Sequence, residues 1–226
     1  MNFSGELSDE HKQEMLKHSN FSQATIVDHY NELSKNYEGV YLRAGWHDPL
    51  KCAELAHETI GDDLAPTAEV IDFGCGTGLV GKYLVERGFK NICGIDGSAG
   101  MLEKCREKGC YKDLNELFLG APDTFPEKFH NKYDVLTASG ILAEGHLDNS
   151  VFEEMLLALK KGGYAVFSTR VMYLTQYKYG EKIKELEETG RWQLVKEITF
   201  ERYDQLEEAV GRFSKVEVKG FVYQKL

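Results

Sequence analysis

A short apolar segment that ends in three alternating glycines constrains this chain more than any other feature. Residues 68–73 are rich in β-branched side chains, and Gly74-Cys75-Gly76-Thr77-Gly78 follows directly, before an apolar helical pattern that begins at Leu79. A short apolar run bounded by glycines is typical of a buried strand. Glycine permits a tight turn and lets the backbone approach a ligand closely, and the first N–H groups of the next helix have no partner within that helix. The pattern therefore predicts a strand, a ligand-binding loop and a helix in succession.

Two acidic residues refine the expected ligand. Asp96 closes the next apolar segment, 91–95, and Asp72 lies two residues before the first glycine of the loop. A carboxylate at the end of the second strand can accept hydrogen bonds from both ribose hydroxyls of a nucleoside. A dinucleotide-binding loop reads G-x-G-x-x-G, whereas this loop reads G-x-G-x-G. Because the charge of Asp72 would repel a pyrophosphate and suit a cationic amino group, the loop favours a nucleoside that carries an amino acid over NAD.

Predicted strands and helices alternate along most of the chain. Strands are expected at 68–73, 91–95, 117–119, 133–138 and 164–169, and helices at 79–86, after Ser98, after Asp148 and at 181–188. This alternation indicates a parallel sheet with right-handed crossovers. Two further strands, 193–200 and 215–224, flank a short helix at 203–210, so we expect the last strand to run antiparallel. Upstream, helices are expected at 26–37 and 48–60, the second with Asp48 as its cap and Pro49 in its first turn.

Length and composition limit the classes of function. The 226 residues suit a single domain over 23–226, preceded by a polar arm, 1–22, that is helical over 9–17. The net charge of −10 disfavours nucleic-acid substrates, and no apolar stretch approaches the length of a membrane span. The five cysteines include no C-x-x-C pair, which argues against a zinc site. We expect a cytoplasmic monomer without a metal, whose partner is a small-molecule substrate rather than nucleic acid or membrane.

At these residues the chain resembles class I S-adenosylmethionine-dependent methyltransferases. The stretch 72–81 is similar to their first motif, Gly94-Ile95-Asp96-Gly97-Ser98 with Met101-Leu102 to the second, and 159–163 to the sixth. Within that class it resembles the Williams–Beuren syndrome region methyltransferase-like family, on Gly97-Ser98, Lys108-Gly109-Cys110-Tyr111 and Glu144-Gly145. The resemblance implies an α/β fold: a single Rossmann-like three-layer sandwich with a seven-stranded, mostly parallel sheet in the order 3-2-1-4-5-7-6, strand 7 antiparallel. It also implies S-adenosyl-L-methionine as the cofactor and S-adenosyl-L-homocysteine as its product.

The resemblance implies a set of cofactor contacts as well. The methionine part would lie over the first two glycines of the loop, the ribose on Asp96 and the adenine against Met101, beneath a cover that contains Tyr37 and Trp46. The expected contacts are Tyr37, Arg43, Trp46, Asp72, Gly74, Cys75, Gly76, Gly78, Leu79, Asp96, Gly97, Ser98, Met101, Leu119, Gly120 and Ser139. Many members of the class carry an aspartate after strand three that binds the adenine amino group. Here Leu119, Gly120 and Ala121 stand at that place, so backbone groups or the later Asp123 would take this role.

The chemistry requires little beyond positioning. Methyl transfer from a sulfonium is an in-line displacement with a neutral leaving group, and a base is needed only when the nucleophile arrives protonated. Glu144 and His146, after the fourth predicted strand, are the candidate catalytic bases, although loop residues of these types also serve structure. Tyr173, Tyr177 and Tyr179 with Arg170 would line either an acceptor pocket or the surface. The N-P-P-Y pattern typical of adenine or glutamine methylation is absent.

The sequence therefore predicts a methyltransferase that acts on a small molecule, or less readily on a protein. The alternative is a protein that binds the cofactor or its product without turning it over. An NAD-dependent oxidoreductase is a weaker hypothesis, because both the glycine spacing and the absence of a Tyr-x-x-x-Lys pair argue against it.

Overall fold

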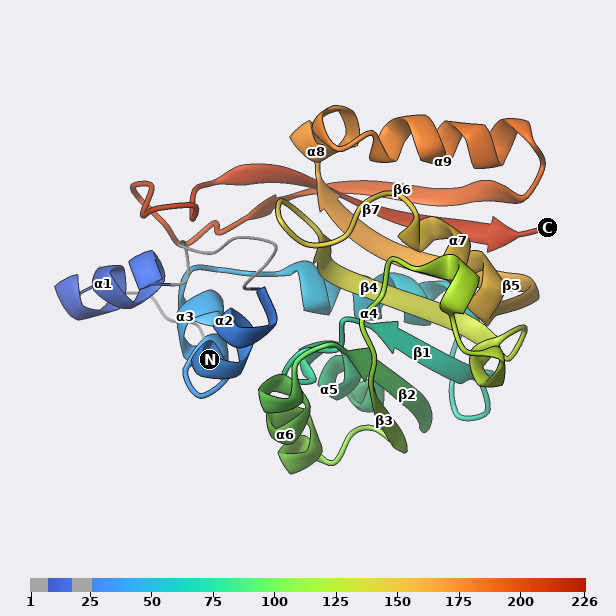
Figure 1. Ribbon diagram of the computed structural model, residues 1–226, viewed down its shortest axis with the longest axis horizontal. Coiled ribbons are helices and arrows are strands. Elements are labelled where there is room, and N and C mark those ends of the chain that lie inside the picture. Colours follow the sequence, from blue (N-terminus) through green and yellow to red (C-terminus); the bar gives the residue numbers. More distant parts are fainter. Residues whose placement is uncertain (1–7, 18–25) are drawn as a thin grey trace.

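The computed structural model describes residues 8–17 and 26–226 of the chain. Its strands are β1 Glu69–Phe73, β2 Asn91–Asp96, β3 Asp113–Glu116, β4 Tyr133–Leu142, β5 Leu159–Arg170, β6 Trp192–Arg202 and β7 Val216–Lys225. They form one sheet in the order β3-β2-β1-β4-β5-β7-β6, whose strands are labelled in Figure 1. The strands from β1 to β5 pair in parallel, whereas β7 runs antiparallel to both β5 and β6. The predicted fold class, strand order and antiparallel strand 7 are confirmed.

Helices cover both faces of this sheet. They are α1 Asp9–Lys17, α2 Ile26–Leu33, α3 Tyr37–Arg43, α4 Asp48–Ile60, α5 Leu79–Glu86, α6 Ala99–Lys108, α7 Val151–Ala158, α8 Val171–Gln176 and α9 Tyr179–Glu188, with 3-10 turns at η2 Pro122–Thr124 and η3 Glu127–Phe129. Among the helices of the described residues, none combines the length and the apolar character that a membrane crossing requires.

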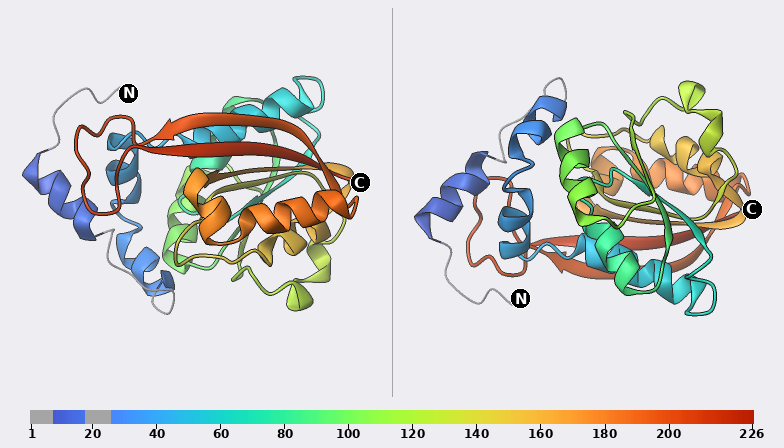
Figure 2. Two further views of the ribbon diagram at one scale, coloured as in Figure 1. Left: turned by 90° about the horizontal axis from the view of Figure 1, so that it is seen from above. Right: turned by 90° about the horizontal axis from the view of Figure 1, so that it is seen from below.

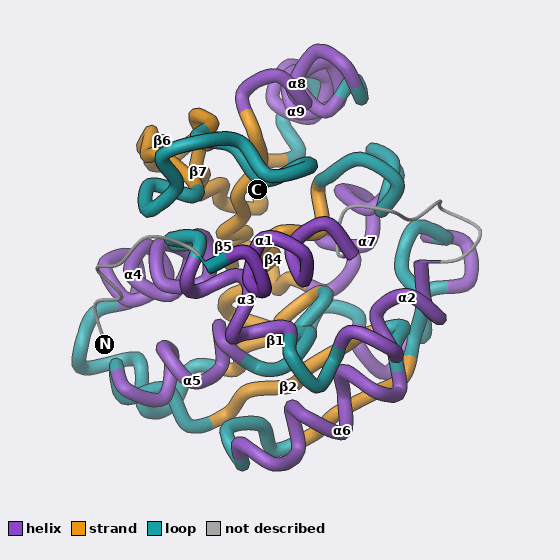
Figure 3. The backbone as a smooth tube through the Cα atoms, turned by 90° about the vertical axis from the view of Figure 1, so that its left-hand side faces the viewer, coloured by secondary structure: helices purple, strands orange, loops and turns teal. Residues whose placement is uncertain are grey.

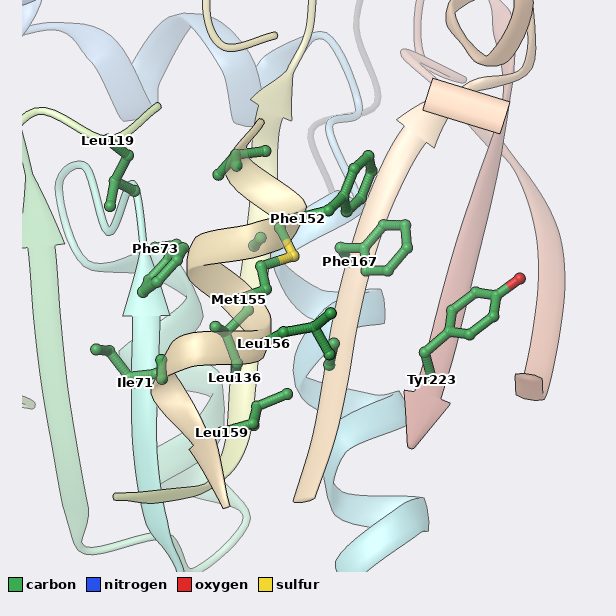
Figure 4. Close-up of a cluster of buried hydrophobic side chains, with 14 of the residues drawn as sticks. Ile71, Phe73, Leu119, Leu136, Phe152, Met155, Leu156, Leu159, Phe167 and Tyr223 are labelled. Carbon is green, nitrogen blue, oxygen red and sulfur yellow. The ribbon is translucent and has the colours of Figure 1, made fainter. Parts of the chain in front are cut away.

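The alternation of side chains along the central strands builds two separate cores. Successive residues of a strand point to opposite faces, so Val70 and Val135 pack toward α4 and α5, while Ile71 and Leu136 pack toward α7 and α9. Figure 4 shows the second core, where side chains of α7 lie against the strands. All four strand residues are fully buried. A parallel sheet covered on both faces fixes the carboxyl ends of β1, β2 and β4 at one edge, which is where ligands bind in such folds.

The N-terminal helices and the tip of the β6–β7 hairpin meet at that edge. The hairpin extends beyond the sheet, and its tip, residues 203–215, lies against α1 and α3 (Figure 2). Met15 of α1, Tyr41 of α3 and Phe213 of the tip belong to one buried cluster. We call α2, α3 and residues 44–47 the cap, and Figure 3 looks onto this end of the molecule. Segments from opposite ends of the chain thus form one structure over the carboxyl edge.

Several predicted elements differ from those observed. The helix expected at 26–37 is interrupted at 34–36 and becomes α2 and α3. The third strand lies at Asp113–Glu116 instead of 117–119. The prediction missed it because an edge strand with a polar, partly exposed sequence lacks the apolar run of a buried strand. No helix forms over 203–210: the backbone there makes turns, and the positive φ of Tyr203, 61°, is incompatible with a helix start. The short helix α8 was not expected. The predicted boundary at residues 22 and 23 lies outside the described residues.

The start of α4 also differs in its chemistry. His47, not Asp48, occupies the cap position, and Asp48 is the first helical residue with a fully buried carboxylate. This carboxylate accepts hydrogen bonds from Nε and Nη2 of Arg202, at the end of β6, and from Oγ of Ser168, on β5. The residue expected to cap a helix instead joins the base of the cap to the sheet.

Candidate active site

A pocket at the carboxyl edge gathers most of the expected site residues. Its open space, including the part that is continuous with solvent, is about 890 Å³. The expected residues that line it are Tyr37, Trp46, Gly74, Cys75, Gly76, Leu79, Asp96, Gly97, Ser98, Met101, Leu119, Ser139 and His146. Positions spread over more than a hundred residues of sequence therefore share one cavity.

The three glycines of the loop have left-handed backbone conformations, which glycine adopts more readily than other residues. Gly74, Gly76 and Gly78 have φ values of 64°, 54° and 88°, in the left-handed region that other residues rarely adopt. A Cβ on Gly74 would lie 2.1 Å from Cγ2 of Ile141, whereas one on Gly76 would meet only the Gly74 carbonyl oxygen within 4 Å, at 3.9 Å. Gly76 thus presents bare backbone to the pocket. Gly78 faces away, since its Cβ would lie 3.0 Å from Sγ of Cys105, and it does not line the pocket.

Asp96 holds the loop and lines the cavity at the same time. Its Oδ2 accepts a hydrogen bond from the Gly76 N–H and its Oδ1 one from the Ser98 N–H, both at 2.8 Å. Burial raises the pKa of this carboxyl, and the two backbone donors oppose the shift by stabilising the anion. Each carboxylate oxygen can accept a second hydrogen bond. The side chain is therefore placed to receive two hydroxyl groups from the pocket without releasing the loop.

Asp72 has a different role from the one expected. It is fully buried behind the pocket and does not line it. Its carboxylate accepts hydrogen bonds from Oη of Tyr111 at 2.6 Å and from Oγ1 of Thr137 at 2.7 Å, and Tyr111 Oη accepts the Gly81 N–H at 2.9 Å. Burial raises the pKa of Asp72 from its usual 3.8 to about 7, against the effect of these donors. Asp72 thus links β1 to β4 and, through Tyr111, to the first turn of α5.

The loop after β3 is held by a residue that the sequence did not point to. The carboxylate of Glu154, on α7, accepts hydrogen bonds from the N–H groups of Gly120 at 2.8 Å and Ala121 at 3.0 Å, and it is only 1% exposed. Gly120 itself does not line the pocket, while Leu119 and the exposed Phe118 do. A buried acid four positions before the end of the apolar helix α7 carried no signal specific enough to find it.

The cap brings a hydroxyl and an imidazole together at the pocket wall. Oη of Tyr30, on α2, lies 2.7 Å from Nε2 of His146, and Nδ1 of His146 lies 2.7 Å from the carbonyl oxygen of Glu144. The Glu144 side chain is exposed and does not line the pocket, so this residue contributes its backbone rather than its carboxylate. Burial lowers the pKa of His146 from 6.5 to about 4, and the charges of Arg212 and Arg202 act in the same direction. Of the two candidate bases, only His146 is placed to act in the cavity.

Other expected contacts lie elsewhere, and further lining residues were missed. Arg43, at the end of α3, does not line the pocket, and neither do Arg170 and the tyrosines of 173–179. The lining residues not expected are Ile26, Val27, Tyr30, Pro49, Thr77, Val80, Leu117, Phe118, Gly140, Ile141 and Leu147. Most are apolar or aromatic. Such residues give no sequence signal of their own, because the same types fill ordinary cores.

One buried polar atom in this wall has no protein partner. Oγ of Ser139, at the end of β4, makes no hydrogen bond within the described residues, although the residue is only 7% exposed. An unpaired buried hydroxyl costs free energy unless a ligand or water satisfies it. Together with the bare backbone at Gly76 and the carboxylate of Asp96, it makes a polar floor suited to an amino-acid-bearing nucleoside. The residues present thus fit the expected cofactor.

Comparisons with known proteins agree with this geometry. Residues 64–211 match the model of a methyltransferase domain family. The chain is 34% identical to human methyltransferase-like protein 27 over 131 residues, which is 56% of this chain and 52% of that protein. It is 25% identical to malonyl-[acyl-carrier protein] O-methyltransferase of Acetivibrio thermocellus over 142 residues, 62% of this chain and 47% of that protein. The chain spans about half the length of these curated relatives.

Solved structures show the same fold. Magnesium protoporphyrin IX methyltransferase from Synechocystis PCC 6803, solved with bound SAM, superposes with a TM-score of 0.63 at 14% identity, covering 92% of this chain and 98% of that one. A TehB-like SAM-dependent methyltransferase from Corynebacterium glutamicum gives 0.58 at 17% identity, covering 88% and 99%. The resemblance to class I S-adenosylmethionine-dependent methyltransferases is confirmed. The narrower resemblance, to the Williams–Beuren region family, stays a prediction.

Proposed function

The chain belongs to the methyltransferase domain family, and on that premise we propose that it transfers a methyl group from S-adenosylmethionine to a small-molecule acceptor by in-line displacement. One observation carries the proposal: the glycine loop, Asp96 and the unpaired Ser139 hydroxyl line a single pocket beneath an aromatic cap. When bound, the cofactor would supply a methyl group activated on a sulfonium. The protein would supply position, which is the larger part of this catalysis.

The floor of the pocket would hold the cofactor. Gly74 and Gly76 would receive the methionine part, Gly76 with bare backbone, and Asp96 would accept the ribose hydroxyls. The Ser139 hydroxyl would form a hydrogen bond with the amino-acid portion of the cofactor. Leu119 and Met101 would contact the adenine ring, in a loop that Glu154 holds in place. Each assignment uses an atom or surface that faces the cavity.

The cap supports a small molecule as the acceptor. Tyr30, Tyr37 and Trp46 all line the pocket from the side of the N-terminal helices. Trp46 lies against the backbone of Gly140, where an added Cβ would come within 3.0 Å of the indole ring. An acceptor must therefore reach the cavity beneath the cap, which suits a compact molecule better than the surface of a folded protein.

Calorimetry tests cofactor binding first. We expect S-adenosylmethionine and S-adenosylhomocysteine to bind with micromolar affinity and NAD not to bind. Gly76→Val should abolish binding, because its side chain would enter the cavity. Gly109→Val is the matched control: Gly109 has a similar φ of 66°, its Cβ would meet nothing within 4 Å, and it does not line the pocket. Equal losses in both variants would show that backbone strain, not the cradle, explains the effect.

A labelling survey tests transfer. Protein with tritiated S-adenosylmethionine should label the small-molecule fraction of a cell extract. Label confined to the protein fraction would contradict a small acceptor. No label in either fraction, with cofactor binding intact, would point to a binding protein that does not turn the cofactor over.

A further inference from the structure

Resting on the proposed binding of S-adenosylmethionine, we propose that Asn31 of α2 is a positioning residue: it caps helix α6 from outside, and in doing so it orients Asp96 for the ribose and fastens α2 across the pocket. The side-chain oxygen of Asn31 accepts hydrogen bonds from Oγ of Ser98 at 2.7 Å and from the Gly100 N–H at 2.9 Å. Both donors belong to the start of α6, which follows β2 and Asp96 directly. The contacts join residues 67 and 69 positions apart in the chain.

The Asn31 oxygen satisfies a backbone group that α6 leaves open. The first N–H groups of a helix have no partner within that helix. Ser98 is the N-cap residue, and its Oγ accepts the Met101 N–H at 3.1 Å, while Asn31 accepts the Gly100 N–H. Because the Gly100 N–H can only donate, the atom of the Asn31 amide that it meets is the oxygen, and the Ser98 hydroxyl donates to the same atom. The start of α6 is therefore capped by one residue of its own and by one from the cap.

Ser98 connects this cap to the pocket. Its N–H donates to Oδ1 of Asp96 at 2.8 Å, and the Gly76 N–H holds Oδ2 at the same distance. Ser98 thus contacts Asn31 through its side chain and Asp96 through its backbone. Asn31 itself does not line the pocket, so it acts on a ligand only through its neighbours. Fixing Ser98 fixes the direction of the acid, and an acceptor that is already oriented loses less conformational freedom when hydroxyl groups bind to it.

The backbones of α2 and α6 approach closely at this point. An added Cβ on Gly100 would lie 3.0 Å from Cα and 3.1 Å from the carbonyl oxygen of Asn31. Figure 3 shows the two helices side by side. Glycine inside a helix costs folding free energy, yet a larger residue at Gly100 would press against the backbone of α2. The glycine therefore permits the distance at which the Asn31 oxygen reaches the helix start.

α2 is fastened on the other side of the pocket as well. Oη of Tyr30 lies 2.7 Å from Nε2 of His146, in the loop after β4, and also shares a hydrogen bond with the Arg212 guanidinium. Three side chains of α2 line the pocket between these attachments. Because β2 and β4 flank β1 in the sheet, the neighbouring residues Tyr30 and Asn31 hold α2 to both sides of the glycine loop. Asn31 supplies the attachment on the side of Asp96.

Calorimetry with S-adenosylhomocysteine and its 2′,3′-dideoxy analogue tests the role of Asn31. Asn31→Ala should weaken the first by about 5–30-fold, as expected for two partly exposed neutral hydrogen bonds, and the second by less than about threefold. A general loosening of α2 would weaken both ligands alike. Asn31→Asp keeps an oxygen for both donors and should bind S-adenosylhomocysteine within about threefold of wild type. Asn36→Ala is the matched control and should bind both ligands as wild type does, because this exposed asparagine between α2 and α3 contacts Glu14 instead of α6.

A double variant tests whether Asn31 acts through Asp96. Asn31→Ala/Asp96→Asn should bind S-adenosylhomocysteine within about threefold of Asp96→Asn alone, since two residues that act through one contact do not have additive effects. Hydrogen exchange gives a second readout. S-adenosylhomocysteine should slow amide exchange in α2 of wild type, and it should slow it much less in Asn31→Ala at equal occupancy of the pocket.

The outcomes separate this inference from the proposed function. Failure of wild type to bind S-adenosylhomocysteine would overturn the methyltransferase assignment. Normal binding by wild type, with equal losses for the two ligands in Asn31→Ala or with no recovery in Asn31→Asp, would overturn the role of Asn31 alone. Losses that multiply in the double variant, or equal protection of α2 in Asn31→Ala and wild type, would do the same.

Discussion

Replacing Asp96 with asparagine removes a charge and an acceptor from the pocket while keeping the side-chain shape. In the structure one carboxylate oxygen accepts the Gly76 N–H and the other the Ser98 N–H, both at 2.8 Å. An asparagine has one acceptor oxygen, so its NH₂ group would face one of these two donors. The variant therefore weakens the ribose contact and the anchor of the glycine loop together.

The magnitude follows from these contacts. A hydrogen bond to a charged group contributes about 1.5–3 kcal/mol, and one buried N–H left unpaired costs about 1–3 kcal/mol of folding stability. We expect the affinity for S-adenosylhomocysteine to fall by about 2–3 kcal/mol, roughly 30–150-fold. We expect the free energy of unfolding to fall by about 1–3 kcal/mol in the absence of ligand.

Calorimetry with two ligands checks the reasoning. Wild type should prefer S-adenosylhomocysteine to its 2′,3′-dideoxy analogue, and Asp96→Asn should bind the two nearly alike. Glu116→Gln is the matched control, because Glu116 pairs with Asp96 in the sheet register, is exposed and makes the same charge change outside the pocket. Unchanged affinity in Asp96→Asn, or an equal loss in Glu116→Gln, would refute the ribose contact.

Three further predictions concern stability. Asp48→Ala should lower the free energy of urea unfolding by about 3–5 kcal/mol, because Arg202, which is 5% exposed, would stay buried without its carboxylate partner. The double variant Asp48→Leu/Arg202→Met should recover most of that loss. Gly81→Ala should lower it by about 1–3 kcal/mol, since the new Cβ would lie 2.2 Å from the Tyr111 ring, and an unchanged thermal midpoint would contradict this. The pKa of His146 is about 4 in the folded protein and 6.5 in the unfolded chain, so the unfolded chain binds more protons between these two pH values. The stabilisation from neutral His146 is therefore complete above about pH 6.5, and the free energy of unfolding falls by up to about 3 kcal/mol toward pH 4. Urea unfolding at pH 7 and at pH 4.5 should show a smaller difference in His146→Gln than in wild type.

Local sequence patterns were sufficient for most of the sheet and for the floor of the pocket. The helix over 79–86 and the cap and stop of α6 at Ser98 and Gly109 appear as expected. Gly74 and Gly76 signal positive φ directly, because few other residues adopt it. Asp96 was found for a similar reason: a strand end beside a glycine loop fixes which side chain faces a ligand.

Errors came where a residue's role depends on a distant partner. The polar edge strand β3 lacks the apolar run by which a buried strand is recognised, so the apolar 117–119 was taken for it. The apolar residues of 203–210 predict a helix, yet Leu206 and Val210 pack against the cap cluster from an irregular segment. Asp72 and Asp48 were placed by local rules, whereas the structure gives them partners from distant strands and from the loop before β3.

The amino-acid sequence by itself determined the order of strands and helices, the parallel sheet, the glycine loop and the acid at the end of β2, because backbone preference and side-chain periodicity act within a few residues. Only the tertiary structure decided what closes the pocket. Tyr30 meets His146 across 116 positions, and Arg202 meets Asp48 across 154. Such buried polar pairs form when packing brings distant segments together, and that selection has no counterpart in local sequence.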